Sequence, residues 1–166
     1  MAADPELEAV LEKWGSEDRA QECLKEEFNE INLKAFRGRL HLPRIWIKPM
    51  WLSKGLLGEQ NAGGNYEPKE GNWLATISLF TAVLLEDDLR RRVLAHEMVH
   101  HWEPTIKEET ESIDYPTSID RTIAQRFSNP SGERSWRSRH SRTFIAKACC
   151  VARALGFPPE KLLFGK

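Results

Sequence analysis

One segment of the chain has residue types and spacing suited to metal-dependent hydrolysis, His96-Glu97-Met98-Val99-His100. Two histidines four positions apart on a helix lie about 40° apart around its axis, so both imidazoles can reach one cation. Glu97 lies about 60° from His100, where a carboxylate can hydrogen-bond a metal-bound water without ligating the metal. The H-E-x-x-H pattern therefore predicts a zinc site in which Glu97 is the general base.

The helix that must carry this motif is predicted over 86–103. Glu86-Asp87-Asp88 places negative charge at its positive end, and Pro104 predicts where it stops. From Val93 to Trp102 the positions outside the motif are apolar almost all the way round, which is typical of a central buried helix. The alternative is a core helix with two structural histidines, but buried imidazoles and a buried carboxylate would each need a partner. A metal meets that need.

A catalytic zinc takes three protein ligands and leaves its fourth position to water, so a third ligand is required. Positions 103 and 106 hold Glu and Ile, which excludes the metzincin pattern. His140 lies near the start of a helix predicted over 138–155, in line with an apolar stripe that must face the core. It is the preferred third ligand. The acidic alternatives that stay open are Glu103, Glu108, Glu109 and Glu111.

Several other side chains near the motif have weaker signals. His101 points about 100° away from His100 around the helix, and His41 stands in a turn before Pro43, so both are predicted to be ordinary residues. The residue that stabilises the oxyanion of peptide hydrolysis is left open among three candidates. They are Tyr66, Tyr115 and Arg139.

The remaining pattern predicts an α+β fold in one domain over 1–166, with helices around the zinc helix and a small flanking sheet. Two N-terminal helices are expected within 5–37, the second starting at Ser16. Strands are expected at 45–48 and 73–80, with a loop or hairpin connection over 55–71.

Two expectations about the substrate follow from this arrangement. An extended peptide is expected to add as a strand along 73–80, where backbone hydrogen bonds give affinity with little sequence preference. The long connection at 104–137 is expected to border the active-site cleft, because it leaves the zinc helix after His100 and returns at His140.

The charge balance bears on partners. The chain has 24 Lys and Arg against 25 Asp and Glu, but residues 1–114 carry 14 basic and 22 acidic side chains, whereas residues 115–166 carry 10 and 3. The basic end predicts weak, non-specific DNA binding, and the alternative is that it pairs with the acidic part of the chain. The residues predicted for this surface are Arg134, Arg137, Arg139, Arg142, Lys147 and Arg153.

The cysteines and the N-terminus bear on the compartment. Three cysteines, of which Cys149 and Cys150 are adjacent, suggest no disulfide framework and favour a reducing environment. The acidic start of the chain lacks the layout of a signal peptide, and no apolar run is long enough to span a membrane. We expect an intracellular protein, in the cytoplasm or nucleus.

Several segments together resemble the SprT-like family of zinc metalloproteases, which includes the Spartan DNA–protein crosslink proteases. The resemblance covers roughly Phe28 to Leu155. Its marks are Phe28, Ile31 and Phe36, Ile45–Ile47, Ala62-Gly63, Ile77-Ser78-Leu79, Leu94 to His100, and His140-Ser141-Arg142-Thr143-Phe144. The resemblance implies a zinc endopeptidase with a zincin-like domain, whose substrates include DNA-associated proteins.

In that family two motif histidines and a downstream histidine bind zinc, and the glutamate is the catalytic base. The resemblance therefore assigns zinc to His96, His100 and His140, and catalysis to Glu97. Three features differ from the family: Arg139 stands where Gly is usual, the 39 residues between His100 and His140 are more than expected, and three cysteines cannot form its zinc ribbon. The alternative function is a non-catalytic module that zinc staples together and that binds DNA or a protein through its basic end.

Overall fold

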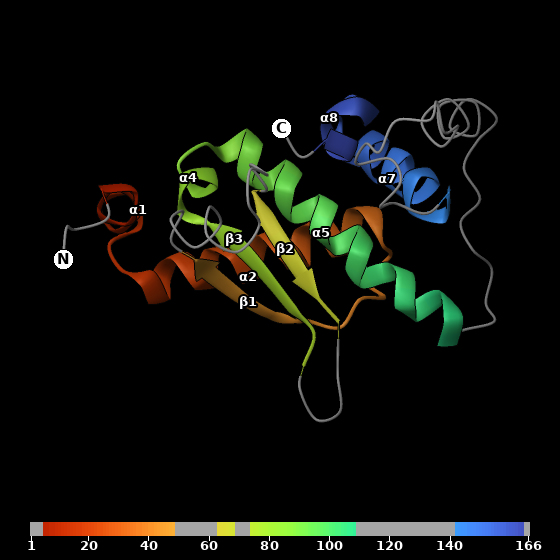
Figure 1. The fold of residues 1–166 in the computed structure, drawn as a ribbon, viewed down its shortest axis with the longest axis horizontal. Helices are drawn as coiled ribbons and strands as arrows, with labels where there is room; N and C mark the ends of the chain where they lie inside the picture. The colour runs from red at the N-terminus through yellow and green to blue at the C-terminus, as the bar shows by residue number, and fades with distance from the viewer. Residues whose placement is uncertain (1–4, 49–62, 69–73, 109–141, 165–166) are drawn as a thin grey trace, which may run out of the picture.

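The computed structural model describes residues 5–48, 63–68, 74–108 and 142–164, and these residues form a mostly helical α+β structure (Figure 1). The predicted α+β class is confirmed at this level. The elements are α1 (Pro5–Trp14), α2 (Glu17–Ala35), β1 (Arg44–Lys48), β2 (Gly64–Glu67), β3 (Thr76–Phe80), α4 (Thr81–Leu84), α5 (Asp87–Glu108), α7 (Arg142–Leu155) and α8 (Pro159–Phe164).

The two N-terminal helices predicted within 5–37 are confirmed. Ser16 is the N-cap of α2, and its side-chain oxygen accepts a hydrogen bond from the backbone N–H of Arg19 at 3.1 Å. The C-terminal end of α2 is closed by Gly38, whose φ of 70° suits glycine and whose N–H donates to the carbonyl of Asn32. Between these caps α2 buries one stripe, which includes Leu24 and Phe28.

The sheet has the order β1-β3-β2, with β1 parallel and β2 antiparallel to β3. β1 and β3 fall in the two predicted strands. β2 is a correction, because it lies inside the segment 55–71 that the glycines marked as a connection. A Cβ at Gly64 would lie 2.9 Å from the carbonyl oxygen of Ser78 and 3.0 Å from Val93 of α5. This glycine therefore permits close packing within a strand.

The central position of β3 corrects the expected docking of substrate along 73–80. Both edges of β3 are already hydrogen-bonded, to β1 on one side and β2 on the other. An added strand needs a sheet edge, and in the described part of the chain the edges belong to β1 and β2.

The motif helix α5 is longer than predicted, because it continues through Pro104 to Glu108 instead of stopping at 103. Proline lacks the N–H for the bond to the carbonyl four residues earlier, and its ring crowds that carbonyl, but its φ is compatible with a helix. Residues 104–108 of the predicted connection are therefore helical, and its other residues lie outside the described part of the chain.

The C-terminal helices pack against α5. α7 covers the predicted ligand helix from Arg142 onward, ends at Leu155 and is followed by Gly156 at φ 79°. α8, which the sequence pattern did not predict, begins after three intervening residues. Figure 1 shows α5 running between the sheet and the α7–α8 pair, in agreement with its contacts to both.

One cluster of buried apolar side chains connects these elements, with Val10 from α1, Phe28 from α2, Ile77 from β3, Leu94 from α5 and Leu162 from α8 among its members. The central, buried position predicted for the motif helix is confirmed. None of the helices in the described segments is both long and apolar enough to cross a membrane.

Candidate metal centre

α5 presents the two motif histidines on a stripe that is partly accessible to solvent. Every side chain from Val93 to His101 is buried except those of His96 and His100, which are of intermediate exposure. Their spacing of four residues places them on one face, one turn apart. The predicted pair is therefore brought together where the helix can reach a ligand.

The two imidazole rings lie close together and share an aromatic neighbour. Their centroids are 5.2 Å apart with an angle of 73° between the ring planes. Phe144, in the first turn of α7, has its ring centroid 5.1 Å from that of His96 and 4.3 Å from that of His100. The start of α7 thus packs directly against both motif histidines.

His96 is oriented by a backbone carbonyl of α8. Its Nδ1 lies 2.8 Å from the carbonyl oxygen of Leu162. A carbonyl only accepts, so Nδ1–H is the donor, and the lone pair of the neutral ring lies on Nε2, the nitrogen that would ligate a metal. Such a carbonyl partner is the usual outer-shell contact of a zinc-ligating histidine, so the ring fits the predicted metal.

Sequence reasoning missed this contact with Leu162. Every residue has a backbone carbonyl, whatever its side chain, so the residue type at position 162 gives no signal for this contact. Only the packing of α8 against α5 brings the two groups together.

Glu97 is a buried carboxylic acid, with 7% of its surface exposed. The described residues give it no hydrogen bond or ion pair, and burial raises its pKa to about 8. A buried carboxylate without a partner is costly in a purely structural role. A nearby cation would lower its pKa and favour the charged form.

Glu103 is placed as a neighbour of His100 on the side of Nδ1. Its Oε1 lies 4.0 Å from Nδ1 of His100. This distance is too long for a hydrogen bond. The position is that of an outer-shell carboxylate. In the predicted centre both motif histidines ligate through Nε2, so a carboxylate on the Nδ1 side of His100 does not favour Glu103 as the third ligand.

The predicted third ligand, His140, lies outside the described residues, as do Glu109, Glu111, Tyr115 and Arg139. Within the described segments no group of three or more His, Cys, Asp or Glu side chains is arranged to hold a metal. His140 precedes Phe144 by four residues in the chain. The ring that packs against both motif histidines is therefore a near sequence neighbour of the predicted ligand.

His101 has a different environment from the motif pair. Its Nε2 lies 2.7 Å from the carbonyl oxygen of His41, and its Nδ1 lies 3.4 Å from the hydroxyl of Tyr66. Burial lowers the pKa of His101 and raises that of Tyr66, so both groups are held in their neutral forms. The Tyr66 ring is parallel to that of His100, with an interplanar angle of 5° and centroids 6.3 Å apart.

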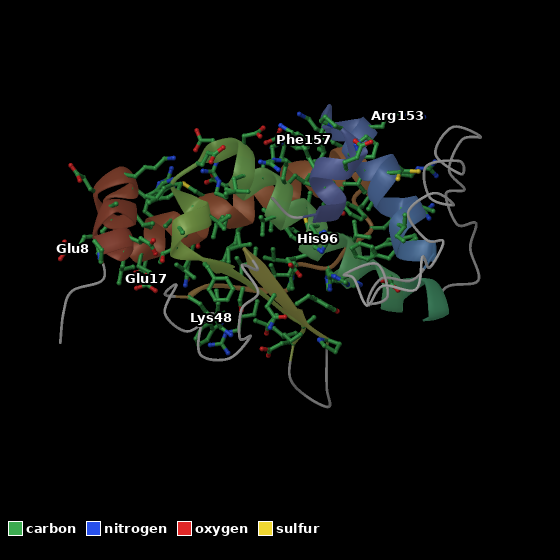
Figure 2. All side chains as sticks on the ribbon, turned by 45° about the horizontal axis from the view of Figure 1, so that its top comes forward. Glu8, Glu17, Lys48, His96, Arg153 and Phe157 are labelled. Atoms are coloured by element: carbon green, nitrogen blue, oxygen red, sulfur yellow. The ribbon has the colours of Figure 1, made fainter. Side chains whose placement is uncertain are left out.

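The predicted basic surface is only partly within the described residues. Lys147 is a correction, because it is 4% exposed and its ammonium lies over the rings of Phe36 and Trp102 at 5.2 and 4.9 Å. An ammonium held against two rings in the core is not presented to phosphates. Arg153 is exposed on the outside of α7, whereas His96 lies in the middle of the molecule (Figure 2).

The side chains of the other four predicted basic residues are not described: those of Arg134, Arg137, Arg139 and Arg142.

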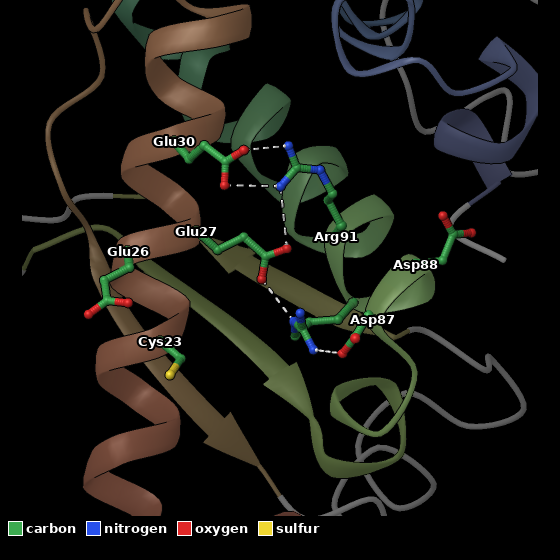
Figure 3. Close-up of a pocket in the computed structure, with 8 residues that line it drawn as sticks. Cys23, Glu26, Glu27, Glu30, Asp87, Asp88 and Arg91 are labelled. Carbon is green, nitrogen blue, oxygen red and sulfur yellow. Dashed lines mark hydrogen bonds and ion pairs between the residues drawn. The ribbon is translucent and has the colours of Figure 1, made fainter. Parts of the chain in front are cut away.

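A separate polar groove lies between α2 and the N-terminal turns of α5 (Figure 3). Arg90 donates to Glu27 at 2.8 Å and to Asp87 at 2.6 Å, and Arg91 donates to Glu30 at 3.2 Å. None of the residues that line this groove belongs to the H-E-x-x-H motif, and its charged side chains are engaged in ion pairs within the protein. The groove is therefore a packed ion-pair network between two helices.

Comparison of the chain with known protein families, curated proteins and solved structures finds no match.

Proposed function

We propose that the protein is a zinc-dependent endopeptidase with a zincin-like, SprT-type domain. The proposed ligands are His96, His100 and His140, and the proposed catalytic base is Glu97. The proposal combines the H-E-x-x-H motif with the environment of its three functional side chains on α5.

The observation that carries the proposal is the contact between His96 and α8. The 2.8 Å contact from Nδ1 to the Leu162 carbonyl fixes the ring tautomer with its lone pair on Nε2. His100 lies beside it at 5.2 Å between ring centroids. A helix whose histidines served only packing would have no need for this paired, oriented arrangement beside a buried carboxylate.

Zinc, when bound, supplies a positive charge that lowers the pKa of a coordinated water towards about 7 and polarises the scissile carbonyl. Glu97 takes a proton from the attacking water as the water oxygen bonds to the carbonyl carbon. The same carboxyl group then delivers that proton to the amine nitrogen as the C–N bond breaks. The burial of Glu97 keeps bulk water from competing for this proton.

The substrate is proposed to be an extended polypeptide that pairs with the edge of β2. This strand packs against α5, and its antiparallel bonds to β3 occupy only one of its two edges among the described residues. Backbone pairing of this kind would accept many sequences, which suits unfolded or DNA-associated proteins. β2 thus replaces β3 as the docking strand.

The main alternative is a non-catalytic module in which zinc only stabilises the fold. A closed structural site has four protein ligands and no use for a carboxylate beside an open position. Glu97, buried and with no hydrogen bond or ion pair to the described residues, therefore favours an enzyme. DNA binding by the basic end stays a separate proposal, now without Lys147.

The decisive experiment compares the wild type with Glu97→Gln in zinc content and in cleavage of a fluorescently labelled, reduced and alkylated protein. We expect Gln to preserve fold and zinc while cleavage falls by at least about 100-fold, the scale of a lost general base. Equal cleavage by both proteins would show that the activity comes from elsewhere. Zinc binding by a wild type that cleaves no unfolded protein would favour the structural module.

A further inference from the structure

The side chain of Tyr66 lies beside His100 and His101, and it has no part in the mechanism above. Tyr66 comes from β2, the proposed docking strand, and it stacks parallel to His100. Its ring centroid lies 5.6 Å from that of His101, and its hydroxyl oxygen lies 3.4 Å from Nδ1 of that histidine. The phenol hydroxyl is therefore held between β2, the proposed docking strand, and α5.

The direction of the hydrogen bond follows from the other nitrogen of His101. The carbonyl of His41 can only accept, so Nε2 carries the proton at the 2.7 Å contact. A neutral imidazole has one N–H, so Nδ1 is an acceptor and the Tyr66 O–H is the donor. The tautomer is thus assigned from the hydrogen-bond network.

The His41 carbonyl is itself fixed by a clamp from α2. The buried side chain of Asn32 donates to the carbonyl of Leu40 at 2.9 Å and accepts from its N–H at 3.1 Å. Leu40 immediately precedes His41, so the clamp holds the backbone that orients His101. The orientation of the Tyr66 hydroxyl is in this way determined from the core.

The bond between Tyr66 and His101 is suited to exchange. At 3.4 Å it is long for a hydrogen bond from a hydroxyl, and therefore weak. It orients the phenol, yet breaking it costs little energy. A hydrogen bond from the same hydroxyl to an anionic oxygen would be shorter and about twice as strong as a neutral one. The phenol is therefore preorganised for an acceptor that appears only when negative charge develops.

We infer that Tyr66 donates the hydrogen bond that stabilises the oxyanion of peptide hydrolysis, and that His101 is the positioning residue for it; the inference rests on the proposed protease function. The carbonyl oxygen gains an electron pair when water attacks and loses it when the C–N bond breaks. Tyr66 keeps its proton throughout, because Glu97 carries the proton from water to the amine. The step needs no further acid or base.

The chain offers a matched control, because it has only two tyrosines. We expect Tyr66→Phe to keep the ring stack on His100, the zinc content and KM, while kcat falls by about 100-fold, as for a lost oxyanion donor. Tyr115→Phe should cleave as the wild type does. Loss of kcat in Tyr115→Phe with unchanged kcat in Tyr66→Phe would overturn the inference.

Two amide substitutions separate the two bonds of His101. The Asn side chain reaches the region of Nδ1 and can accept from Tyr66, whereas the longer Gln side chain reaches the region of Nε2 and can donate to His41. If His101 acts through Tyr66, His101→Asn should retain a higher kcat than His101→Gln. The reverse order would show that His101 serves only to hold the backbone at His41.

A measurement on the metal-free protein tests the geometry without turnover. Nitrogen NMR of the His101 ring should show a protonated Nε2 and an acceptor Nδ1, and Tyr66→Phe should shift the Nδ1 resonance towards that of a nitrogen with no hydrogen bond. A protonated Nδ1 in the wild type would overturn the assignment of Tyr66 as donor.

The outcomes also separate this inference from the proposed function. Cleavage that Glu97→Gln abolishes and Tyr66→Phe leaves intact would overturn the role of Tyr66 alone. A wild type without any cleavage, or cleavage insensitive to Glu97→Gln, would overturn the protease function and the role of Tyr66 with it.

Discussion

The two ends of helix α5 treat their polar side chains in opposite ways. In its first two turns each ionisable group from Asp87 to Arg92 has an oppositely charged partner, and three of these pairs join α5 to α1 or α2. Two turns later, Glu97 is buried without a partner among the described residues, and His96 is oriented by a carbonyl. The ion pairs at the start of α5 stabilise the fold. The buried Glu97 and the oriented His96 are explained if a ligand binds beside them.

The number of charged groups therefore does not identify a functional site. The groove beside Asp87 and Arg90 contains more charge than the histidine face does. Its ion pairs are satisfied within the protein and need no ligand. At the motif, Glu97 is buried and His96 is oriented, but Glu97 has no hydrogen-bond or ion-pair partner among the described residues. This difference from the groove indicates a functional site.

The largest expected effect is the loss of zinc from the histidine face. Changing His96 or His100 to Ala removes a proposed imidazole ligand, so zinc affinity should fall by more than about 100-fold, beyond the effect typical of an outer-shell partner. Competition with a chromophoric chelator measures this affinity. Unaltered zinc affinity in either variant would remove that histidine from the site and leave the two ends of α5 equivalent.

A smaller loss of zinc is expected when α8 is removed. Deletion of residues 159–166 eliminates the Leu162 carbonyl that orients His96, so zinc affinity should fall by about 10 to 100-fold. The affinity should be measured at a temperature where the shortened chain remains folded, since Leu162 also belongs to the core. The exposed residue Lys161 gives the control, and Lys161→Ala should bind zinc as the wild type does. Full affinity after the deletion would contradict the role of the carbonyl.

At the other end of α5 we expect a loss of stability with no loss of zinc. Glu27 is a mostly buried acceptor for Arg90, with 12% and 14% of the two side chains exposed. Glu27→Ala should lower the free energy of unfolding by roughly 2 kcal/mol, as for a lost hydrogen bond to a charged group. Glu26→Ala, at an exposed position beside the same groove, should change it by less than about 0.5 kcal/mol. Weaker zinc binding in Glu27→Ala would show that the two ends are coupled.

The smallest effect is a dependence of stability on pH at Asp87. Its hydrogen bonds from Lys13 and Arg90 lower its pKa from 3.8 to about 2. A carboxyl group with a depressed folded-state pKa contributes stability above its unfolded pKa and loses it as the pH falls through the folded value. Thermal unfolding between pH 4 and 2 should therefore be less steep in pH for Asp87→Asn than for the wild type. Identical slopes would exclude this contribution.

Much of the fold followed from local sequence signals. The cap at Ser16, the β-branched and aromatic residues at 45–48 and the apolar surface of the motif helix all predicted the observed elements. β2 and the extension of α5 were wrong because glycine and proline signal turns locally, whereas packing decided otherwise here. Gly64 permits β2 to approach Val93 closely, and Pro104 continues the helix at the loss of one hydrogen bond.

The candidate site was predictable to the extent that it depends on side-chain identity. The spacing of His96 and His100 predicted their shared face, and the apolar neighbours of Glu97 predicted its burial. The carbonyl partner of His96, the Phe144 ring beneath both histidines and the pairing of Tyr66 with His101 were not predictable. They depend on long-range packing of α8, α7 and β2 against α5, which leaves no mark in residue spacing.

The proposed zinc centre depends most on its third ligand, and the zinc affinities of His140→Ala and Glu103→Ala test which residue this is. The two variants, measured beside the wild type by chelator competition and metal analysis, address the preferred ligand and its nearest acidic alternative. We predict one zinc per chain in the wild type, a loss of more than about 100-fold in affinity for His140→Ala, and at most about a 10-fold loss for Glu103→Ala. Full zinc affinity in His140→Ala would contradict the proposed centre, and its combination with zinc loss in Glu103→Ala would make Glu103 the third ligand.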